Sequence, residues 1–111
     1  MDQVNIKPGR VGGLYNSLKM IEFCQRHGLD AWIGGMFETG IGRAQNLQIA
    51  ALLPDAKAHD LSPSSRYFLK DVLMKPISME NGHIDAGDFM NVSINEKALD
   101  SMTIDKIILK K

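Results

Sequence analysis

The chain has 111 residues, with 13 basic and 13 acidic side chains, a hydrophobic fraction of 44% and one cysteine. This size and composition are typical of one globular domain and exclude an intrinsically disordered chain. Because the charges cancel and the basic residues do not cluster, we expect no nucleic-acid partner and no attraction to a membrane surface.

The apolar runs, the N-terminus and the cysteine bear on location. The longest uninterrupted apolar run, Ile49–Leu53, is far shorter than the roughly 20 residues that cross a bilayer. The first residues lack the basic and apolar regions of a signal peptide. Cys24 cannot form an internal disulfide, which fits a reducing compartment. We therefore expect a cytoplasmic protein.

The first predicted unit is a strand followed by a helix. In the strand, Val4 and Ile6 share one face, while Asn5 and Lys7 share the other. A Pro-Gly turn and a glycine-rich loop come next. Apolar spacing then predicts a helix from about residue 13 to 27, ended by a left-handed glycine at position 28. Its expected buried stripe consists of Leu14, Leu18, Ile21 and Cys24.

The second unit repeats this order. The segment 29–35, "LDAWIGG", predicts a short buried strand that ends in two glycines. A helix is expected from Thr39 or Gly40 to Leu53, because Pro54 ends it. Its expected core residues are Ile41, Ala44, Ala51 and the neighbouring leucines.

A third unit is predicted more weakly, by a strand at 56–61 and a short helix that Ser62 and Pro63 open. The three strands recur at intervals of about 26 residues, each before a helical pattern. This rhythm predicts an α/β fold of parallel strands with crossover helices. Three such strands leave two open edges, so we expect either a small domain that dimerises or part of an eight-unit barrel.

The rhythm ends near Pro76, and we divide the chain into residues 1–75 and 76–111. The second part is predicted to contain a hairpin around Asn81-Gly82, a helix capped by Asn95 and a last strand near the C-terminus. Because only three residues precede the first strand, we also expect that a segment of the natural protein lies upstream or on another chain.

Lys7 is the foremost candidate for chemistry, because it follows a strand at the edge where barrel and open α/β enzymes keep their sites. It could act as an acid, a base or an anion partner, or simply be a solvated lysine. The stretch 9–13, "GRVGG", could instead offer N–H groups to an anion, as in a small anion-binding module. Glu38 is expected to cap a helix, and His59 has no partner at a metal-ligand spacing.

Three stretches carry a resemblance to a known family: "NIKPGRVGG", "HGLDAWIGGMFETGIGRAQNLQIAALL" and "DLSPSSRYF". In this order and spacing they resemble the C-terminal part of the enolase superfamily, in its o-succinylbenzoate synthase and N-acylamino acid racemase branch. The resemblance runs from Val4 to Phe68 and more loosely to Lys111. It implies that residues 1–75 form strands six to eight of a (β/α)8 TIM-type barrel. The tail 76–111 would pack on a capping domain that this chain lacks.

The resemblance also implies a site. Lys7 matches the catalytic lysine at the end of the sixth strand, which supports the charge of an ene-diolate intermediate. Gly35 and Met36 match residues that line the substrate pocket, and Tyr67 falls where the family places an aromatic side chain near it. The implied substrate is a small-molecule carboxylate, and the implied cofactor is Mg²⁺.

Other parts of the family pattern do not match any residue here. The Lys-x-Lys pair and the acidic metal ligands belong to earlier strands, and "AGDFMNV" replaces a Gly-Pro-Gly-like stretch. We therefore expect the C-terminal segment of an o-succinylbenzoate synthase-like lyase of menaquinone biosynthesis. It would be inactive by itself and would need its N-terminal portion or another copy of the chain. The alternatives are N-acylamino acid racemase activity, or a non-catalytic fragment of a split or decayed gene.

Overall fold

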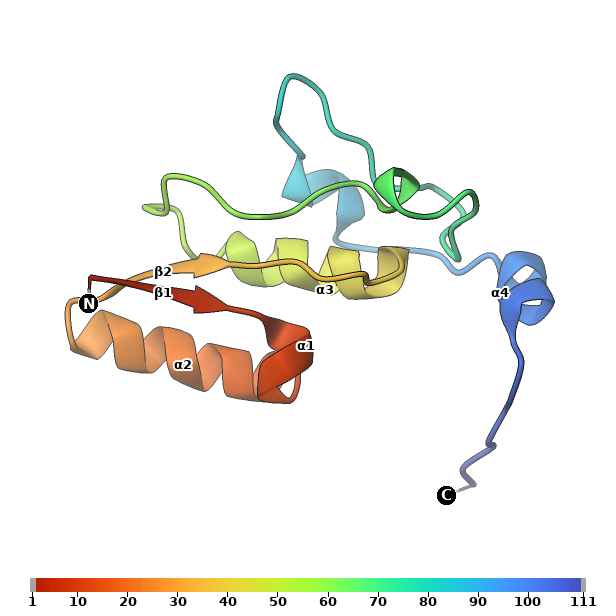
Figure 1. Cartoon of the computed structure of the whole chain (residues 1–111), viewed down its shortest axis with the longest axis horizontal. Helices are drawn as coiled ribbons and strands as arrows, with labels where there is room; N and C mark the ends of the chain where they lie inside the picture. Colours follow the sequence, from red (N-terminus) through yellow and green to blue (C-terminus); the bar gives the residue numbers. More distant parts are fainter. Residues whose placement is uncertain (1, 111) are drawn as a thin grey trace.

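The computed structural model describes residues 2–110 (Figure 1). None of the helices in this range is both long and apolar enough to cross a membrane. The elements in chain order are β1 (Gln3–Ile6), α1 (Pro8–Val11), α2 (Leu14–Arg26), β2 (Asp30–Ile33), α3 (Gly40–Ala50), the 3-10 helices η1 (Ser64–Arg66) and η2 (Ala86–Phe89), and α4 (Glu96–Met102).

The two strands form a parallel pair, as the rhythm of the sequence predicts. Their register places Ile6 beside Ile33, and both side chains are fully buried. The helices α2 and α3 cover this face, where one cluster joins residues of both strands and both helices. On the other face, Asn5 is exposed and Trp32 is half-buried. The α/β order is therefore confirmed, with helices on one face of the sheet.

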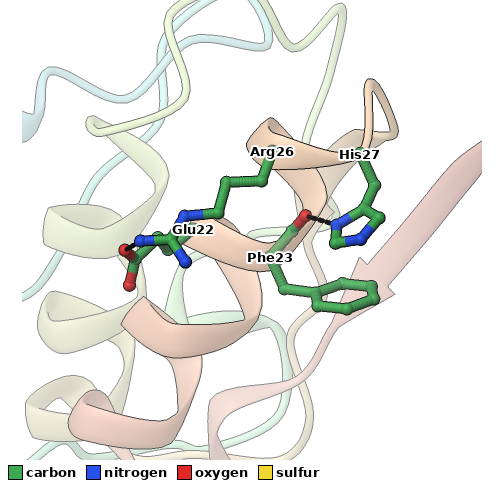
Figure 2. Close-up of polar contacts among 4 residues, drawn as sticks. All are labelled: Glu22, Phe23, Arg26 and His27. Carbon is green, nitrogen blue, oxygen red and sulfur yellow. Dashed lines mark hydrogen bonds and ion pairs between the residues drawn. The ribbon is translucent and has the colours of Figure 1, made fainter.

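Helix α2 has nearly the predicted bounds, and Gly28 follows it with φ 65°. The last turn carries an ion pair between Arg26 and Glu22, and His27 Nδ1 donates to the carbonyl oxygen of Phe23 at 2.8 Å (Figure 2). The buried stripe differs from the prediction, because Ser17 is buried beside Ile21 and Cys24 while Leu14 and Leu18 are exposed.

The segment between β1 and α2 is a helical turn, α1, and not the predicted loop. The N–H groups of Arg10 and Val11 donate to the carbonyl oxygen of Lys7, and that of Gly13 donates to Pro8. These three donors already have backbone partners, which argues against the possibility that "GRVGG" offers them to an anion. Glycines are required at positions 12 and 13, because both have φ above 90°.

Helix α3 begins at the predicted residue and ends at Ala50, shortly before Pro54. Ala44 is buried as expected, but Ile41 and Ala51 are exposed. The first turn receives its cap from a distant residue, since the N–H of Gly40 donates to Asp71 Oδ1 at 2.8 Å. Local sequence patterns do not predict this contact, because the two residues are far apart along the chain.

The third unit is where the prediction fails. Of the expected strand at 56–61, only Asp60 pairs with the sheet, through a parallel bridge to Gly34. The expected helix after it is reduced to η1. The carboxylate of Asp71 accepts hydrogen bonds from Gly40 of α3 and from the Ser64 hydroxyl. These tertiary contacts hold the segment after Ser64 against the start of α3, so it does not form the helix that its local pattern predicts.

The tail follows the prediction in two of three places. Glu80 and His83 form an antiparallel bridge across Asn81 and Gly82, both with positive φ, so the turn is confirmed. The helix capped by Asn95 is confirmed as α4, because Asn95 Oδ1 accepts from the N–H of Ala98 at 3.1 Å. The prediction of a last strand is wrong, because residues 104–110 form no strand and extend away from the strands and helices (Figure 1). The division near residue 75 stays a prediction.

Candidate functional site

Lys7 directly follows β1 and crosses over the end of β2. Its backbone is extended, so its side chain shares the sheet face of Asn5, as predicted. The ammonium Nζ donates a hydrogen bond to the carbonyl oxygen of Gly35 at 3.0 Å. A Cβ at Gly34 would press on the Asn5 carboxamide and lie 3.0 Å from Lys7 Cγ. Because position 34 is glycine, the Lys7 side chain can cross the end of the strand without a steric clash.

Gly35 lets a third segment approach the sheet. Its N–H donates to the carbonyl oxygen of Asp60 at 2.7 Å, and the N–H of Asp60 donates to Ile33 at 3.0 Å. A Cβ at Gly35 would stand only 2.8 Å from that Asp60 oxygen. The glycine pair at the end of β2 thus serves two contacts, one to the lysine and one to the neighbouring backbone.

The residues that the sequence assigns to a site line one cavity of about 230 Å³. Volumes of roughly 300–1,000 Å³ are usual for sites of drug-sized ligands, so this cavity would hold a small group. Lys7 and Arg43 bring positive charge, and Asp60 brings negative charge, which favours an anionic group. The lining residues are the four predicted ones, Lys7, Gly35, Met36 and Tyr67, together with Phe37, Arg43, Asp60 and Ser62.

One wall of the cavity is aromatic. The rings of Phe37 and Tyr67 meet edge to face, with their centroids 4.9 Å apart. The guanidinium carbon of Arg43 lies 5.3 Å from the centre of the Tyr67 ring, within the range of a cation–π contact. Tyr67 is therefore held in the wall by a ring on one side and a cation on another, although it lies in an irregular segment.

Four lining residues were not predicted from the sequence, namely Phe37, Arg43, Asp60 and Ser62, and Arg43 is the one with the most hydrogen bonds in the site. It lies in α3 and is only 4% exposed. No spacing rule identifies it, because a helical pattern assigns charged residues to the solvent face and assigned Ile41 to the core. The structure reverses these two, leaving Ile41 exposed and Arg43 buried.

Glu38 does not cap α3, so that prediction is wrong. Its Oε2 accepts from the N–H of Met36 at 2.7 Å, and its Oε1 accepts from Asn46 Nδ2 at 3.3 Å. The carboxylate folds back onto the loop that follows β2. It therefore fixes the position of Met36 in the cavity wall.

His59 lies next to the bridge but faces away from the lysine. Its Nδ1 accepts a hydrogen bond from the N–H of Ile33 at 3.0 Å. Partial burial lowers the pKa of His59, because desolvation disfavours the charged imidazolium. Within residues 2–110, no group of three or more His, Cys, Asp or Glu side chains could hold a metal ion.

Comparison with known proteins places this site in a family. The model of the family described as Enolase C-terminal domain-like matches residues 1–90. The chain belongs to this family. An o-succinylbenzoate synthase of Bacillus subtilis (strain 168) is 47% identical over 81 residues, and an N-succinylamino acid racemase of an Amycolatopsis species is 38% identical over 106 residues.

These matches cover most of this chain and a small part of each relative. The Bacillus match spans 73% of the chain and 22% of the relative, and the Amycolatopsis match spans 94% and 28%. A solved structure of a probable mandelate racemase from Alicyclobacillus acidocaldarius superposes with a TM-score of 0.79 at 38% identity. That match covers 94% of this chain and 29% of the other. The chain thus spans less than a third of the length of these relatives.

Proposed function

We propose that this chain supplies one part of the active site of an o-succinylbenzoate synthase-like lyase. Its two βα units and the bridged segment at Asp60 would be strands six to eight of a (β/α)8 barrel. The observation that carries the proposal is the meeting of Lys7 with Gly35, Met36 and Tyr67 around one cavity. Four residues chosen from the sequence line this cavity, with Lys7, Gly35 and Met36 at the ends of the two parallel strands and Tyr67 in the segment that follows Asp60.

The proposed reaction removes a proton from the carbon next to a carboxylate and then expels a hydroxyl group as water. The proton departure leaves two negative charges on the carboxylate oxygens, and a nearby fixed cation lowers the free energy of that state. Lys7 is suited to this role, because Gly35 holds its ammonium at the cavity wall. The α-proton would pass to a base from the remainder of the barrel. A general acid there would then protonate the hydroxyl, which leaves as water with the electrons of its C–O bond while the ene-diolate electrons form the double bond.

Magnesium is the cofactor that the family resemblance implies. Hard divalent cations of this kind require several oxygen ligands, chiefly carboxylates. The described residues 2–110 contain no cluster of acidic and histidine side chains that could supply them. The residues of this chain therefore do not fit a magnesium site of their own, and we assign the metal ligands to the proposed partner portion.

The proposed partner is a polypeptide that carries the other barrel strands and a capping domain. The test is to co-express this chain with the Bacillus subtilis relative from which the matching segment has been deleted. We expect dehydration activity from the pair and none from the chain by itself. Dehydration by the chain alone would contradict the need for a partner. Racemisation of N-acylamino acids without dehydration would favour the racemase alternative. The absence of both activities in the pair would favour a non-catalytic fragment.

A substitution at Lys7 tests its role in the same assay. Loss of a positioned acid–base or charge-stabilising group costs about 10²- to 10⁴-fold in rate. We expect this loss in Lys7→Ala, with unchanged assembly of the pair. The matched control is Lys106→Ala in the exposed tail, which should keep full activity. Equal activity of Lys7→Ala and the control would overturn the proposed role.

A further inference from the structure

Arg43 is a buried cation that forms no ion pair with the carboxylates of the described chain. Burying a charge is costly unless hydrogen bonds replace its water. For Arg43 these hydrogen bonds go to neutral oxygen atoms. Its four N–H···O contacts reach three carbonyl oxygens and one hydroxyl. A guanidinium that uses four of its five N–H donors in this way indicates a residue that holds other segments in place.

The segments that Arg43 holds are the two loops that line the cavity. Toward the loop after β2, Nε donates to the carbonyl oxygen of Glu38 at 2.8 Å, and Nη2 donates to the carbonyl oxygen of Met36 at 3.3 Å. Toward the loop after Asp60, Nη1 donates to the Ser62 carbonyl oxygen at 2.7 Å and to its hydroxyl at 3.2 Å. One side chain from α3 therefore bridges two loops that come from neighbouring parallel segments.

We propose that Arg43 is a positioning residue that sets the substrate-binding wall formed by Met36 and Tyr67. This inference rests on the proposed function. Lys7 is held independently by Gly35, so Arg43 governs how well the substrate fits and not the proton chemistry. A lysine could not replace it, because an ammonium has its three donors at one point and cannot span two loops as a planar guanidinium does.

The first test is kinetic and uses the assembly of the chain with its partner portion. We expect Arg43→Lys to raise KM about tenfold and to change kcat less than about threefold, because substrate binding is lost while the chemistry at Lys7 remains. A merely structural role would lower the concentration of folded enzyme, and hence kcat, without moving KM. That result would overturn the proposal.

The matched control is Arg26→Lys. Arg26 is exposed at the end of α2, and its one ion-pair partner among residues 2–110 is Glu22, one helical turn away (Figure 2). The same chemical change there should leave both KM and kcat at the values of the unsubstituted chain. A tenfold KM rise in this control as well would show that the effect is not specific to Arg43.

The second test needs no activity, so it stays decisive if the proposed function fails. Amide hydrogen exchange is measured on the 111-residue chain. The N–H of Met36 donates to the carboxylate of Glu38. Arg43 in turn donates to the carbonyl oxygen of Glu38, so it holds the residue on which the Met36 N–H depends. In Arg43→Lys we expect Met36 to exchange about tenfold faster or more, with the amides of α2 unchanged. Unchanged exchange at Met36, or an equal acceleration throughout the chain, would contradict the positioning role of Arg43.

Discussion

The segment from β1 to α3 and the segment after α4 differ in what holds them. In the first, the strands and helices share one buried cluster that includes Ile6, Ile33 and Ile49, all fully buried. In the second, every described side chain from 103 to 110 is exposed, including the isoleucines. The cavity takes Lys7, Gly35 and Arg43 from the first segment. The candidate site is therefore built on the part of the chain that packs within itself.

A pair of isoleucine substitutions gives the largest expected difference between these segments. Ile49 is 0% exposed and Ile108 is 71% exposed. We expect Ile49→Ala to lower the free energy of unfolding by about 2–5 kcal/mol, because it leaves a cavity in the core. Ile108→Ala should change it by less than about 0.5 kcal/mol. Urea unfolding of both variants measures the difference, and equal losses would show that the tail is packed as firmly as the sheet.

A glycine substitution tests whether the cavity depends on the sheet. In Gly35→Ala the new Cβ would meet the carbonyl oxygen of Asp60 at 2.8 Å, so the bridged segment must move. We expect a loss of about 1–3 kcal/mol in stability. Gly9→Ala is the control, because a Cβ there has no atom within 4 Å and the helical turn α1 tolerates alanine. Comparable losses in both variants would contradict the close approach at Asp60.

The smallest effect expected concerns pH. Burial lowers the pKa of His59 in the folded state, so below its unfolded value of about 6.5 the unfolded chain binds the proton more readily. The contribution of His59 to stability is therefore present above pH 6.5 and is lost as the pH falls through the folded pKa. His59→Asn keeps an acceptor for the N–H of Ile33 and cannot titrate there. Urea unfolding at pH 7.5 and 5.5 should show a smaller decrease for this variant, and an identical decrease would exclude His59 as the cause.

The sequence predicts best where local pattern and tertiary packing agree. Both strands, α2, α3 and the Asn95-capped α4 follow from periodicity and capping residues, which act within a few positions along the chain. The site residues Lys7, Gly35 and Met36 were identified from motifs at strand ends. Their meeting around one cavity follows from parallel strands, whose carboxyl ends lie on the same edge of a sheet.

The errors arise where a distant contact decides the structure. The helix expected after Ser62 gives way to η1, because Asp71 binds Gly40 and Ser64 in place of continuing a helix. Arg43 was missed because a helical pattern assigns charged residues to the solvent face, while here the guanidinium satisfies backbone oxygens of two loops. No spacing rule within the chain announces either contact.

The carboxylate of Asp71 has a further consequence for the aromatic wall. It fixes Ser64 at one end of a short stretch and its own backbone at the other, so residues 65–70 form a loop closed at its base and exposed along its length. Because substitutions at exposed positions usually change stability little, positions 65, 66 and 68–70 can be exchanged while Tyr67 is kept. Such exchange would reshape the face around Tyr67 for a different ligand while the strands beneath keep their pairing.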